Sequence, residues 1–88
     1  METLIIDLTN PTGLHARPAK NFVNVVQQFS SNISVTYQDK KANGKSLISL
    51  LKLGAESGAQ IKIEIEGEDE QTAFNTLQES LAAGLLEE

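Results

Sequence analysis

The only histidine of this 88-residue chain, His15, lies two positions before its only arginine, Arg17. Gly13 precedes the pair and suits a tight turn or a close backbone approach, because glycine has no Cβ atom. Pro18 follows the pair and fits the first turn of a helix, where its missing N–H would have had no acceptor. Apolar residues then recur at helical spacing from Ala19 onward. We therefore expect His15 to lie at or just before the N-terminus of a helix.

That position has chemical consequences. The first N–H groups of a helix have no acceptor within it, and the helix dipole places partial positive charge there. An anion at the His15 ring would meet these donors and the Arg17 guanidinium, a suitable phosphate site. A histidine so placed can accept a phosphoryl group as a nucleophile and hold it covalently. The alternative is an ordinary surface histidine in a loop, and the spacing alone does not decide between the two.

Two motifs point to one family. The run Gly13-Leu14-His15-Ala16-Arg17-Pro18-Ala19 resembles the active-site signature of HPr, the histidine-containing phosphocarrier family of the bacterial phosphoenolpyruvate:sugar phosphotransferase system. The stretch Asn43-Gly44-Lys45-Ser46, followed by apolar residues, resembles the regulatory serine segment of the same family. The two motifs stand at the separation usual in the family, and the resemblance covers essentially the whole chain.

The resemblance implies a phosphoryl carrier rather than an enzyme, with no cofactor. His15 would accept the phosphoryl group at Nδ1 from phosphorylated enzyme I and pass it to the IIA domains of sugar permeases. Thr12, the backbone N–H groups of Ala16 and Arg17, and the Arg17 side chain would hold the phosphate.

Ser46 has two interpretations. A serine directly before an apolar run, here 47–53, is a common helix N-cap. The resemblance adds regulation, because in many family members of low-GC Gram-positive bacteria a kinase phosphorylates the matching serine. That modification hinders transfer through the histidine and promotes binding to a transcriptional regulator. The alternative function is therefore a regulatory protein-binding module switched by Ser46, with a serine kinase/phosphorylase and such a regulator as partners.

The residues around both motifs suggest a protein-docking surface. We expect Leu50 and Leu53 to face the core while Leu47, Ile48 and Leu51 form a partly exposed apolar patch. Six of the seven basic residues lie between positions 17 and 52, so a basic face forms if they surround His15 in space. The alternative is an ordinary solvated surface with uneven charge. The predicted partner-binding residues are Lys20, Lys45, Leu47, Ile48, Leu51 and Lys52.

Composition excludes several other classes. An apolar fraction of 40% is typical of a folded chain, and the length indicates a single domain over residues 1–88. With no cysteine and one histidine, we expect no metal site. The net charge of −5 argues against nucleic acid as a partner. No segment approaches the ~20 apolar residues that span a bilayer, and no signal peptide is recognisable, so we expect a soluble cytoplasmic protein. The chain has no heptad pattern or long apolar edge, and we expect a monomer.

Periodicity predicts the element order β-α-β-β-α-β-α. The predicted strands are 3–8, 33–37, 41–43 and 61–66, and the predicted helices are 16–28, 47–53 and a last one that Asp69 caps. That last helix is expected to end near Gly84 or at the terminal Glu87–Glu88 pair. The fold class is α+β, and the family resemblance implies an open-faced β-sandwich: a four-stranded antiparallel sheet covered on one face by three helices.

Overall fold

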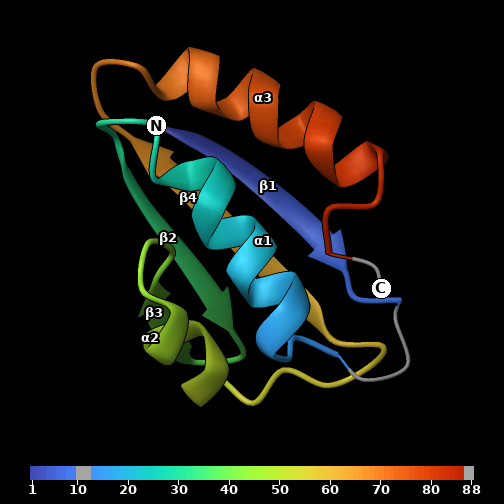
Figure 1. Cartoon of the computed structure of the whole chain (residues 1–88). Helices are drawn as coiled ribbons and strands as arrows, with labels where there is room; N and C mark the ends of the chain where they lie inside the picture. Colours follow the sequence, from blue (N-terminus) through green and yellow to red (C-terminus); the bar gives the residue numbers. More distant parts are fainter. Residues whose placement is uncertain (10–12, 87–88) are drawn as a thin grey trace.

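The computed structural model describes residues 1–9 and 13–86. Within these residues the chain forms β1 (Glu2–Asp7), α1 (Ala16–Val26), β2 (Asn32–Tyr37), β3 (Lys40–Asn43), α2 (Leu47–Lys52), β4 (Gln60–Glu66) and α3 (Glu70–Ala82). The strands pair antiparallel in the order β1-β4-β2-β3. All the labelled helices lie on one face of this sheet and leave the other face open (Figure 1). The predicted α+β open-faced sandwich is confirmed.

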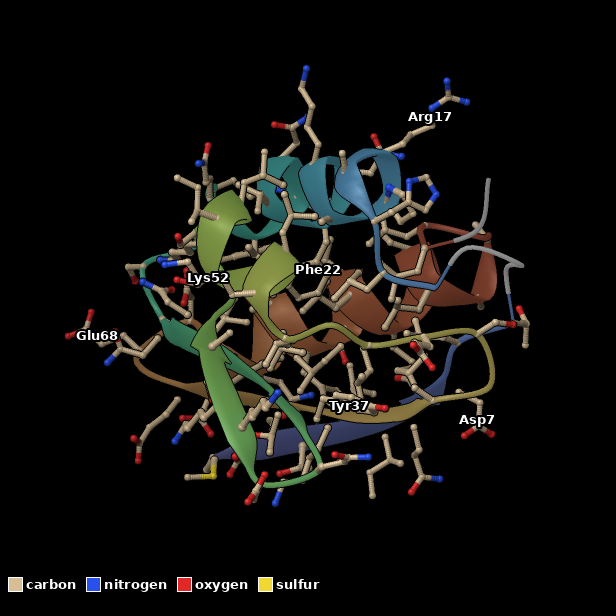
Figure 2. All side chains as sticks on the ribbon, turned by 90° about the horizontal axis from the view of Figure 1, so that it is seen from below. Asp7, Arg17, Phe22, Tyr37, Lys52 and Glu68 are labelled. Atoms are coloured by element: carbon tan, nitrogen blue, oxygen red, sulfur yellow. The ribbon has the colours of Figure 1, made fainter. Side chains whose placement is uncertain are left out.

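The alternation of β4 explains why the sheet has one buried face. Ile61, Ile63 and Ile65 are almost fully buried, whereas the residues between them are charged and partly or fully exposed. Successive side chains of a strand point to opposite faces, so the isoleucines face the helices. Ile63 lies opposite Leu4 of β1 and Val35 of β2, which places it at the centre of the sheet. Figure 2 shows the resulting layers, with the helices above and the strands below.

α1 covers the middle of this sheet. Its buried residues are Pro18, Ala19, Phe22, Val23 and Val26, the apolar face that the spacing predicts. The helix starts at Ala16, as predicted, and ends at Val26, two residues before the predicted end. No described helix is long and apolar enough to cross a membrane.

α3 begins at the predicted place, but the side chain of its N-cap residue bonds another segment instead of the helix. Asp69 occupies the N-cap position, while its carboxylate accepts hydrogen bonds from the turn between α1 and β2. The donors are the N–H groups of Ser30 and Ser31, each at 2.9 Å, and the Ser31 hydroxyl. Asp69 therefore joins two turns that lie far apart in the sequence. The end of α3 agrees with the prediction at Gly84, which has a positive φ of 94°, while Glu87 and Glu88 lie outside the described residues.

Candidate functional site

The turn that carries His15 is packed against a distant segment of backbone. Gly13 has a left-handed φ of 67°, and a Cβ atom added there would lie 2.5 Å from the carbonyl oxygen of Ala55 and 2.7 Å from the Cα of Glu56. The next residue, Leu14, donates its N–H to the same Ala55 oxygen at 2.9 Å. Glycine is therefore required at position 13 for both its conformation and its lack of a side chain.

His15 is the N-cap residue of α1, as the sequence predicts. Its backbone is extended, and its carbonyl accepts the first helical hydrogen bond from the N–H of Ala19 at 3.0 Å. The N–H groups of Ala16 and Arg17 come before Ala19 in the helix and have no acceptor within it, and Pro18 has no N–H. The two amides and the positive end of the α1 dipole thus point out of the helix beside His15.

The His15 ring is only partly accessible. The residue is half-buried, and its Nε2 atom is buried. Nε2 is therefore closed to solvent in this conformation. The Arg17 side chain is exposed and extends from α1 away from the body of the molecule (Figure 2). Thr12, the fourth predicted member of the phosphate site, lies outside the described residues.

Ser46 caps α2 as predicted. Its hydroxyl accepts the N–H of Ser49 at 3.3 Å, and its carbonyl accepts the N–H of Leu50 at 3.1 Å. Gly54, with a φ of 68°, follows the end of the helix in the left-handed conformation that is common for a glycine after a helix. α2 packs beside α1, so the second motif lies on the same helical layer as the first.

The apolar residues of α2 divide as expected. Leu50 and Leu53 are buried, while the side chains of Ile48 and Leu51 are 66% and 39% exposed and Leu47 is half-buried. We call Ile48 and Leu51 the α2 patch. An exposed apolar pair of this size on one helix turn marks a candidate contact surface.

The basic residues do not all gather around His15. Lys20 on α1 and Lys52 on α2 are exposed on the helical layer, together with Arg17. The Nζ atom of Lys45, in contrast, donates to the carbonyl of Phe29, in the turn after α1, at 2.6 Å.

The remaining two basic residues of that group lie on β3, where Lys41 shares the open face of the sheet and a shallow hollow with Glu64 and Glu66. The expectation of one basic face from six residues is therefore wrong, because β3 is the edge strand of the sheet and directs Lys41 away from the helices.

Sequence reasoning missed the contribution of residues 55–56. They touch the His15 turn through backbone atoms, which no side-chain pattern reveals. No cluster of three or more histidine or acidic side chains suited to a metal ion occurs in the described part of the chain. The half-buried His15 and the first amides of α1 together form a site at a helix end that is suited to an anion.

Comparison with known proteins agrees with this geometry. A family model described as the phosphorylation site of the PTS HPr component matches residues 3–83. The phosphocarrier protein HPr of Buchnera aphidicola is 43% identical over 72 residues, which cover 82% of this chain and 85% of that protein. The crystal structure of HPr-C-His from Thermoanaerobacter tengcongensis has a TM-score of 0.88 and 40% identity, and covers 100% of this chain and 99% of that one.

A second kind of relative is much longer. The multiphosphoryl transfer protein of Salmonella typhimurium is 42% identical over 79 residues, or 86% of this chain. The chain spans only 21% of that protein's length.

Proposed function

The chain belongs to the HPr family, the phosphoryl carriers of the phosphotransferase system, and from this membership we propose that His15 accepts a phosphoryl group from phosphorylated enzyme I and passes it to IIA domains of sugar permeases. The observation that carries the proposal is the position of His15 at the N-cap of α1, beside the outward amides of Ala16 and Arg17. A nucleophile and donors for its phosphate lie together there.

We assign the transfer to Nδ1. Nε2 is buried, so Nδ1 is favoured as the ring nitrogen that a donor can approach. In the forward step the Nδ1 lone pair attacks phosphorus, and the N–P bond to the donor histidine breaks in line. In the second step a nucleophile of the acceptor attacks phosphorus in line, and the N–P bond to His15 breaks. No metal or cofactor enters this sequence.

The phosphate would be held by charge and by amides. The Ala16 and Arg17 N–H groups, the helix dipole and the Arg17 guanidinium all stabilise negative charge at this place. Thr12 would add its contact as the family resemblance implies. Because the site is exposed to solvent, this stabilisation is moderate, which suits a carrier that must release its phosphoryl group.

The partner proteins would dock on the helical layer. The α2 patch supplies apolar contact, while Arg17, Lys20 and Lys52 supply positive charge for acidic surfaces. Leu47, half-buried at the start of α2, would contribute at the margin. Lys45 would act indirectly, since its ammonium group is bonded to Phe29.

A second proposed function is regulation through Ser46. Its hydroxyl caps a helix on the same layer as His15, where an added phosphate would be tolerated by the helix and would bring about two negative charges to the docking surface. A serine kinase/phosphorylase and a transcriptional regulator would be the further partners. We further propose that residues 1–88 form one domain that acts as a monomer in the cytoplasm, without nucleic acid as a partner.

Intact mass tests the carrier proposal. Incubation with phosphoenolpyruvate and an active bacterial enzyme I should add one acid-labile phosphoryl group to the wild type and none to His15→Ala. Ser46→Ala serves as the matched control and should accept the group like the wild type. An unmodified wild type, or a phosphorylated His15→Ala, would refute the proposal.

A further inference from the structure

The chain after α3 turns back into the core. Gly84 adopts a left-handed φ of 94°, and the N–H of Leu85 donates to the carbonyl of Ser80 at 2.9 Å. A glycine and a backward hydrogen bond of this kind close a helix and reverse the chain. Figure 1 shows this last segment running from the end of α3 back toward the end of β1. The turn thereby brings Leu86 under the helical layer.

Leu86 occupies the space beneath the His15 turn. Its side chain is only 6% exposed, although it lies close to the end of the described residues. The small apolar interior pocket that it enters is lined by Leu14, Phe22, Val35, Leu50, Ile61 and Leu86 itself. Leu14 is the residue directly before His15, while Val35 and Ile61 belong to the sheet. Leu86 thus lines this pocket together with a residue next to the start of α1 and two residues of the sheet.

We propose that Leu86 is a positioning residue for phosphoryl transfer: it supports Leu14 from below and so fixes the direction of the His15 ring. The inference rests on the carrier function proposed above. Leu14 is held by one backbone bond, to Ala55, and by the packing of its side chain in this pocket. Substitution of Leu86 would weaken this side-chain packing while the hydrogen bonds of the turn remain, and the ring would then sample more directions.

Such a change acts on the rate. Transfer in line requires the reacting nitrogen to be aimed at phosphorus, and a misplacement of about 1 Å can cost a factor of about 100. The burial of Leu86 holds the segment after α3 against the core, and through Leu14 it supports the His15 turn.

The test compares Leu86→Ala with Leu81→Ala. Leu86→Ala opens a cavity beneath Leu14. Leu81 is a half-buried leucine of α3 that packs against the same core but does not line the Leu14 pocket. For both variants we would measure the ring 15N and 1H signals of His15 by NMR, and kcat and KM for phosphorylation by enzyme I. Leu86→Met restores the volume, and Leu86→Val replaces the alanine variant if that protein does not fold.

We expect Leu86→Ala to shift the His15 ring signals and to lower kcat about tenfold with KM unchanged. Leu81→Ala should change neither, and Leu86→Met should recover most of the rate. Unchanged ring signals and kcat in folded Leu86→Ala, or the same changes in Leu81→Ala, would overturn the inference. If the wild type is not phosphorylated at all, the carrier proposal fails, while the ring signals still decide whether Leu86 positions His15.

Discussion

At the scale of a single residue, Gly13 allows the turn before His15 to pack against the backbone of residues 55–56. The sequence predicts a tight turn there, because glycine before a histidine and a helix start is a recognisable pattern. The contact with the Ala55 carbonyl could not be predicted, since it joins backbone atoms of two segments far apart in the sequence. The position of Leu86 beside Leu14 could not be predicted for the same reason, because it depends on the turn after α3.

Alanine substitution separates the conformation of Gly13 from its packing. Gly13→Ala should lower the free energy of unfolding by about 3 kcal/mol, because it combines backbone strain with a clash against Ala55. Gly54 is the matched control, with a φ of 68° against 67° and no atom within 4 Å of an added Cβ. Gly54→Ala should cost about 1 kcal/mol in urea denaturation. Equal losses would show that the contact with Ala55 contributes nothing.

At the scale of the element, α2 is a short helix set by its two ends. Ser46 predicts its start correctly, and the helix ends at Lys52, one residue before the predicted end. The positions of the leucines predict which side is buried. What the sequence does not reveal is the position of the Lys45 ammonium, because a lysine before a serine gives no sign of the Phe29 carbonyl. Local signals define the element, and tertiary contacts define its charged neighbours.

Two Ser46 variants separate capping from charge. Ser46→Asn and Ser46→Asp both keep a good N-cap, whereas Ser46→Ala should lose about 1 kcal/mol of stability. If negative charge at this position hinders docking, Ser46→Asp should be phosphorylated on His15 more slowly by enzyme I than Ser46→Asn. The difference should shrink at high salt, where charges are screened. Equal rates for the two variants at low salt would argue against regulation by charge at Ser46.

At the scale of the whole molecule, one carboxylate ties the two halves of the helical layer together. Asp69 links the start of α3 to the turn after α1, and it satisfies Ser31, which is only 1% exposed. The pKa of Asp69 is lowered mainly by the hydrogen bond from the Ser31 hydroxyl and next by the one from the Ser30 N–H. The sequence places Asp69 at a helix start but does not predict this link, because the turns meet only in the fold.

Acid should weaken this link. The folded pKa of Asp69 lies below that of the unfolded chain, about 3.9, so its stabilising effect is complete above that pH. It is lost as the pH falls through the folded value. Urea denaturation from pH 7 to pH 2 should therefore show a smaller acid-dependent loss of stability for Asp69→Asn than for wild type.

The comparison needs two precautions. The pKa of Glu70 is also lowered, mainly by a hydrogen bond from the N-terminal ammonium, but Glu70 is present in both proteins. Asp39→Asn, an exposed carboxylate in the β2–β3 turn, serves as the control and should follow the wild type. Parallel curves for Asp69→Asn and wild type would show that the pKa of Asp69 is the same in the folded and unfolded chains.

The overall architecture was predictable only in part from the residues themselves. Alternation and helical spacing predict the order of the elements, because each element must bury one face. Strand pairing depends on contacts between distant segments, so the antiparallel sheet and its covered face came from the family resemblance. The expected basic face fails for a similar reason, since Lys41 is close to Lys45 in sequence but lies on the open face of the sheet.

The central claim is that His15 carries the phosphoryl group on Nδ1, and NMR of the 15N-labelled protein tests it most directly. After phosphorylation by enzyme I and phosphoenolpyruvate, coupling of 31P to a ring nitrogen identifies the atom that is modified. We predict coupling to Nδ1 of His15. Coupling to Nε2, or phosphorus on a residue other than His15, would contradict the account.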